Sequence, residues 1–126
     1  MNIAFVTTWD PHDAGIWAGT GYHIARALEA QGCRLEYLGP LRERFVLPFK
    51  VAQLAYQKLR KQSFHRDREP AIVRGFAKQI DERLAGSDAE AVFCVGTIPV
   101  PYLQTTLPVV AWADATYAAM LDAYRF

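Results

Sequence analysis

Four short apolar runs recur along the chain, each bounded by polar or turn-forming residues. They predict strands at residues 3–8, 34–39, 91–96 and 108–113. The first run begins almost at the N-terminus, which is typical of a buried central strand of a parallel sheet. Between the runs, apolar residues return at helical spacing. The predicted helices cover residues 20–31, 45–61, 70–84 and 117–124.

This alternation of strands and helices indicates an α/β fold. We expect a Rossmann-like three-layer αβα sandwich, with a parallel sheet in the strand order 2-1-3-4 and helices on both faces. The 126 residues form a single domain in this interpretation. Because the last predicted helix stops at Phe126 without a cap, we expect residues 1–126 to be part of a longer protein, truncated at the C-terminus.

The composition argues against several classes of function. A formal net charge of +1 gives no reason to expect a nucleic-acid partner. No apolar run reaches the roughly 20 residues that cross a bilayer, and the N-terminus lacks a signal peptide, so a cytoplasmic location is expected. Cys33 and Cys94 show no metal-like spacing and are predicted to be reduced core thiols; a disulfide or a nucleophilic thiol is the alternative.

The segment from Trp9 to Gly21 is the first candidate site. It lies at the carboxyl end of the first predicted strand, and it is longer than the ~2–6 residues that a connection needs. Gly19, Thr20 and Gly21 precede a helix, whose free N–H groups and positive dipole end suit a phosphate or another anion. The alternative is that these residues only cap the helix. We predict substrate binding by Gly19, Thr20 and Gly21.

No cofactor is predicted for this segment. In the dinucleotide fingerprint a third glycine would stand where this chain has Ile24, and no acid follows the second strand, which closes in Leu38-Gly39-Pro40. A Walker A loop is absent because no Gly-Lys-Ser/Thr occurs.

Other residues also carry candidate chemistry. Asp13 stands with Asp10 and His12 in the first loop; the group could bind a metal or act as a base, or it could simply form turns. We predict a substrate contact for Asp13 and no metal. His23 is predicted to point toward the same anion, with an ordinary surface position as the alternative. Asp114 follows the fourth strand, where it would orient an acceptor hydroxyl as a catalytic residue or cap a helix.

The segment 42–68 holds eight of the fourteen Lys and Arg residues against two acids, with aromatic residues between them. It is a candidate for peripheral membrane contact through anionic headgroups, or for binding a phosphorylated acceptor. The alternative is a solvated helix face with ordinary core aromatics.

Several motifs, taken in order, resemble the N-terminal domain of the group 1 glycosyltransferases of the GT-B fold. They are Gly15 to Gly21, the helix ending in Gly32, Leu38-Gly39-Pro40-Leu41, Val95-Gly96-Thr97-Ile98-Pro99 and Leu107 to Thr116. The likeness covers most of the chain. In that family two Rossmann-like domains face each other across a cleft. The N-terminal domain receives the acceptor, and the C-terminal domain binds the nucleotide sugar.

The resemblance implies a function and a set of roles. Gly19, Thr20 and Gly21 would form the loop that approaches the donor diphosphate, and Asp114 would face the cleft. Many relatives place a histidine before the equivalent acid, whereas here Ala113 precedes Asp114. The resemblance implies a glycosyltransferase that uses a nucleotide-sugar donor and an unidentified acceptor, both shared with a second domain. The fragment alone is expected to be inactive.

Two alternatives remain at this stage. A free-standing flavodoxin-like module would use the same loop to hold a phosphorylated small molecule without catalysis. A dehydrogenase half-domain is the third possibility.

Overall fold

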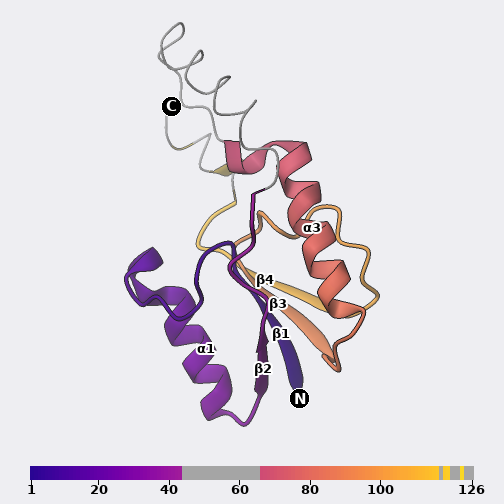
Figure 1. Cartoon of the computed structure of the whole chain (residues 1–126). Coiled ribbons are helices and arrows are strands. Elements are labelled where there is room, and N and C mark those ends of the chain that lie inside the picture. Colours follow the sequence, from indigo (N-terminus) through magenta and orange to yellow (C-terminus); the bar gives the residue numbers. More distant parts are fainter. Residues whose placement is uncertain (44–65, 117, 120–122, 124–126) are drawn as a thin grey trace, which may run out of the picture.

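The computed structural model describes residues 1–43, 66–116, 118, 119 and 123. These residues form an α/β fold around a sheet of four parallel strands in the order β2-β1-β3-β4 (Figure 1). The strands are β1 (Asn2–Val6), β2 (Arg34–Tyr37), β3 (Ala91–Val95) and β4 (Val109–Trp112). The predicted fold class and strand order are confirmed, and each strand is slightly shorter than its apolar run.

Two helices lie on opposite faces of the sheet. The helix α1 (Thr20–Ala30) covers one face and α3 (Pro70–Leu84) covers the other (Figure 1). α3 begins where its apolar spacing predicts, with Pro70 in its first turn, and ends two residues before Gly86. α1 ends where Gly32 adopts a φ of +82° and the N–H of Cys33 donates to the carbonyl of Leu28.

The core has two parts because strand residues alternate between the faces. On the α3 side, Val6, Val92 and Cys94 pack against Phe76 and Ile80. On the α1 side, Phe5 lies between Phe93, at a ring-centroid distance of 5.6 Å, and Tyr37, at 5.7 Å. Phe5, Phe93 and Tyr37 share one register row across the sheet.

The two cysteines differ from each other. Both are free thiols, but only Cys94 is buried, while Cys33 is partly exposed where the chain leaves α1. The expectation that both are core residues was therefore wrong for Cys33. Burial raises the pKa of the Cys94 thiol to about 12, which keeps it protonated and inert at neutral pH.

The first loop contains an element that its sequence did not predict. Residues Ile16–Gly19 form a short 3-10 helix, η1, directly before α1, and a second such turn, η2 (Arg66–Arg68), precedes α3. Both turns lie at the edge of the sheet where the parallel strands end, so they bring side chains to the place where such folds bind ligands.

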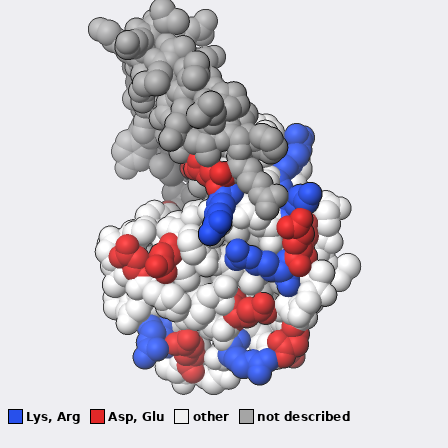
Figure 2. Space-filling view, in the orientation of Figure 1, with Lys and Arg blue, Asp and Glu red and all other residues white. Residues whose placement is uncertain are grey.

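Charges of both signs are mixed over the described part of the face in Figure 2. The ion pairs Arg26–Glu29, Arg34–Asp88 and Lys78–Glu82 are largely exposed, so each contributes little to stability. No helix in the described part of the chain is long and apolar enough to cross a membrane. The predicted helix 45–61, most of the predicted helix 117–124 and most of the basic segment 42–68 lie outside the described residues.

Candidate functional site at the carboxyl edge of the sheet

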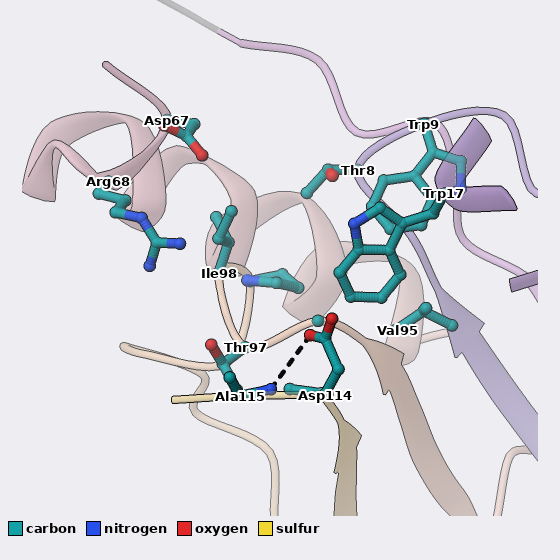
Figure 3. A pocket seen from close by; sticks show the side chains of 13 residues that line it. Thr8, Trp9, Trp17, Asp67, Arg68, Val95, Thr97, Ile98, Asp114 and Ala115 are labelled. Carbon is teal, nitrogen blue, oxygen red and sulfur yellow. Dashed lines mark hydrogen bonds between the residues drawn. The ribbon is translucent and has the colours of Figure 1, made fainter. Parts of the chain in front are cut away.

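A hollow opens where β1, β3 and β4 end (Figure 3). We call it the edge hollow; its volume is about 310 Å³, at the lower end of the range of ligand pockets. Its wall comes from the segments after these three strands, from η1 and from η2. The lining residues are Thr8, Trp9, Trp17, Asp67, Arg68, Val95, Gly96, Thr97, Ile98, Pro99, Ala113, Asp114 and Ala115.

A second hollow adjoins the first on the α1 side. This side hollow has a volume of about 430 Å³ and is lined by Trp17, Ala18, Thr20, Trp112 and Asp114. Trp17 and Asp114 belong to both walls. We call the two hollows together the cleft. Trp17 and Asp114 are therefore the residues on which a ligand spanning the cleft would depend most.

The backbone that carries the Trp17 indole is unusual. Trp17 has φ 55° and ψ 40°, and Ala18 has φ 50° and ψ 30°, so two successive residues other than glycine adopt the left-handed conformation. Each such residue costs roughly 1–3 kcal/mol, and strain of this kind concentrates at functional sites. The Trp17 ring lies 5.4 Å from that of Trp9 and is still 42% exposed. The strained turn thus presents an indole to solvent instead of burying it.

The Trp9 ring packs against the Trp17 ring. It is partly buried, in the layer between the sheet and α1, and packs against the cluster of Phe5, Ala25 and Val95. A Cβ at Gly21 would lie 3.7 Å from the Trp9 indole and 3.7 Å from Val95. A Cβ at Gly21 would therefore make ordinary contacts with Trp9 and Val95.

Among the described residues after β4, Thr116 and not Asp114 makes a hydrogen bond of the capping type. The hydroxyl of Thr116 accepts a hydrogen bond from the N–H of Ala119 at 3.2 Å, which is the geometry of an N-cap. The Asp114 carboxylate accepts only a local bond from the N–H of Ala115, at 3.1 Å, among the contacts described for it. In Figure 3 this carboxylate lies beneath the paired indoles, and Arg68 lies across the hollow from them. The carboxylate can thus accept hydrogen bonds from a bound ligand.

The other predicted site residues divide into two groups. Thr20 reaches the wall of the side hollow, so the structure brings it together with Asp114. Gly19 and Gly21 are buried and line neither hollow. Gly19 has a φ of +77°, which explains a glycine at this N-cap without a ligand. The N–H of Thr20 donates to the carbonyl of Trp17, so one amide at the start of α1 is already satisfied.

Asp13 and His23 lie outside the walls of both hollows. The Asp13 carboxylate accepts a hydrogen bond from the N–H of Gly15 at 2.8 Å, which is a turn-forming role. His23 is exposed on α1, with its ring 5.3 Å from that of Tyr22. Their roles toward a substrate remain predictions.

The rest of the first loop also forms turns. Asp10 accepts a hydrogen bond from the N–H of His12 at 2.9 Å, and the His12 ring packs 4.6 Å from that of Tyr37. Among residues 1–43 and 66–116, no three His, Cys, Asp or Glu side chains are arranged to hold a metal ion. In the described part of the chain, the cleft offers aromatic faces, hydroxyls, carboxylates and the guanidinium of Arg68.

The sequence alone did not identify the three tryptophans or Arg68 as residues of the site. Trp112 ends β4 and Trp9 follows β1 by only a few residues, so both positions are at the carboxyl edge of the sheet. A large aromatic residue at a strand end of a parallel sheet was the available signal. Nothing in the sequence signals that η2 brings Arg68 to the same edge.

No family model, no curated protein and no solved structure was found to match this chain.

Proposed function

We propose that the chain is the N-terminal, acceptor-side domain of a glycosyltransferase with the GT-B fold, which moves a sugar from a nucleotide-sugar donor to an acceptor hydroxyl. The observation that carries the proposal is the cleft at the carboxyl edge of the sheet, in which Asp114 lies beside exposed indoles. Open parallel sheets bind ligands at this edge. The sequence motifs that resemble the group 1 family supply the reaction class.

Asp114 is the catalytic residue in this proposal. Its carboxylate accepts a hydrogen bond from the acceptor hydroxyl and orients the oxygen toward the donor. The guanidinium of Arg68, in the wall of the same hollow, donates to acceptor oxygens. Of Gly19, Thr20 and Gly21, Thr20 is the residue that reaches the cleft, so in this proposal it marks the donor side. The location proposed for the enzyme is cytoplasmic, which cell fractionation would test.

A module that binds a phosphorylated small molecule is the second candidate, and Arg68 is the observation that favours it. Two acids, Asp67 and Asp114, line the same hollow. Carboxylates so close to a phosphate would oppose its negative charge. The cleft therefore favours an acceptor with neutral hydroxyl groups over a phosphate.

The test uses the protein expressed from its complete reading frame. Release of nucleoside diphosphate is measured with UDP- and GDP-sugars, with and without hydroxylated acceptors. We expect acceptor-dependent release that Asp114→Asn lowers about 10²- to 10⁴-fold, the range for loss of a general base. Asp88→Asn is the matched control, because Asp88 is exposed and pairs with Arg34 at the opposite edge of the sheet. Equal rates for the two variants, or no acceptor-dependent release from any donor, would refute the proposal.

A further inference from the structure

All three tryptophans of the chain line the cleft. Trp9 and Trp17 belong to the edge hollow, and Trp17 and Trp112 to the side hollow. The Trp17 and Trp112 side chains are 42% and 52% exposed, although indoles contribute most when they are covered. Exposed indoles that converge on a hollow are typical of binding sites.

The flat faces of these indoles favour a ligand that carries a ring. The Trp17 ring packs against the Trp9 ring, so the Trp9 contact already orders part of the indole before any ligand arrives. A fixed aromatic face loses little conformational entropy when a ring packs on it. The backbone strain at Trp17 and Ala18 is an independent sign of function at the same place.

The polar groups of the edge hollow favour a neutral ligand with hydroxyl groups. Among the described residues, the wall contains two carboxylates, from Asp67 and Asp114, one guanidinium, from Arg68, and the hydroxyls of Thr8 and Thr97. Ionised carboxylates only accept hydrogen bonds, so they match a ligand whose hydroxyls donate. The formal charge of these groups is negative, which disfavours a phosphate dianion.

We infer that the cleft binds a neutral pyranose ring, which packs on the Trp17 indole and donates hydroxyl hydrogen bonds to Asp114. The inference rests on the proposed function in one respect: this ring is the part of the acceptor that the domain recognises. The acceptor is therefore a carbohydrate or glycoside with an uncharged sugar at its reacting end.

The first experiment titrates the chain with uncharged probes in the absence of any donor. The probes are the methyl glycosides of glucose, galactose, mannose and N-acetylglucosamine, and inorganic phosphate is the charged contrast. Intrinsic tryptophan fluorescence is a specific readout because every tryptophan lies at the cleft. We expect a saturable change with at least one glycoside and none with phosphate.

Matched variants then test the contact itself by calorimetry. Trp17→Asn removes the exposed indole, and Tyr102→Asn removes an exposed ring that lines neither hollow. The two positions match, because Tyr102 is 46% exposed and has a φ of 70°, close to the 55° of Trp17, and asparagine tolerates a positive φ. We expect Trp17→Asn to weaken glycoside binding about tenfold or more and Tyr102→Asn to leave it unchanged. Asp114→Asn should weaken it by about fivefold.

Several outcomes would overturn the inference. These are binding of phosphate without any glycoside, no response to any probe, or equal weakening by Trp17→Asn and Tyr102→Asn. If circular dichroism shows that Trp17→Asn does not fold, Asp114→Asn, which changes no volume, decides instead. Glycoside binding without sugar transfer would refute the proposed function alone. Sugar transfer to an acceptor without glycoside binding would refute this inference alone.

Discussion

The strands β1 and β4 are both short and apolar, yet β1 is a central strand and β4 lies at an edge of the described sheet. β1 lies between β2 and β3, and its residues from Ile3 onward are buried. β4 lies at an edge of the described sheet, and all four of its residues are exposed. Phe5 and Val110 belong to the same row across the sheet, where Phe5 is 0% exposed and Val110 51%. Position in the sheet, and not apolar character, decides which strand builds the core.

The difference in burial between β1 and β4 follows from where the two helices pack. The cores on both faces include β1 residues, Phe5 toward α1 and Val6 toward α3. Among the described residues, those of β4 belong to neither buried cluster. As a result β1 supports the fold, while Trp112 at the end of β4 is left to line the cleft.

The largest predicted effect comes from truncating one residue of each strand in the shared row. Phe5→Ala removes a fully buried ring that contacts Phe93 and Tyr37, and we expect the free energy of unfolding to fall by about 3–5 kcal/mol. Val110→Ala should cost less than about 1 kcal/mol because its side chain is half exposed. Urea denaturation measures both. Similar losses for the two variants would show that β4 is covered in solution.

A smaller loss is predicted where the chain passes close to the end of β1. A Cβ on Gly39 would collide with the hydroxyl oxygen of Thr7 and lie 2.9 Å from the carbonyl oxygen of Trp9, whose hydrogen bond with Thr7 is 2.7 Å long. We expect Gly39→Ala to destabilise the protein by about 2–3 kcal/mol. Gly86→Ala is the control, because no atom would lie within 4 Å of its Cβ. If both variants unfold at the wild-type urea concentration, the close approach at Gly39 does not exist.

The next comparison concerns thiol reactivity at two paired positions of β3 and β4. Cys94 is buried, whereas its register partner Ala111 is exposed. In a Cys33→Ser background, we expect the thiol introduced by Ala111→Cys to react with a disulfide reagent at pH 8 at least about 100-fold faster than Cys94. Equal rates would contradict the assigned burial of the two strands.

The same thiol gives a pH dependence. Burial raises the pKa of Cys94 from its ordinary value of 9.0 to about 12, so the folded state holds its proton where the unfolded state has lost it. The stability from this group is complete below about pH 9 and falls as the pH rises toward 12. Unfolding in urea between pH 8 and pH 11 measures the slope, which Cys94→Ala should reduce. An unchanged slope would place the thiol in contact with water.

The sequence predicted the fold more fully than the site. Apolar spacing was sufficient for the four strands and for the start of α3, and the topology rules of parallel sheets supplied the strand order. It could not distinguish β1 from β4, because an apolar run looks the same whether or not helices cover it. Gly19, Thr20 and Gly21 lie close to the cleft, but among these three only Thr20 reaches its wall. Asp114 lines the cleft, and its predicted role stays a prediction, whereas Arg68 reaches the cleft through the fold of η2, which no local pattern encodes.

The central claim is that a ligand is bound by the indoles around Trp17, and not by the amides at the start of α1. A nuclear magnetic resonance titration tests it most directly, because the indole N–H signals of Trp9, Trp17 and Trp112 are separate from the amide signals of Gly19 and Gly21. With a methyl glycoside, the account predicts saturable shifts that are largest for the Trp17 indole. Unmoved indole signals, together with shifts of the Gly19 and Gly21 amides on addition of phosphate, would contradict it.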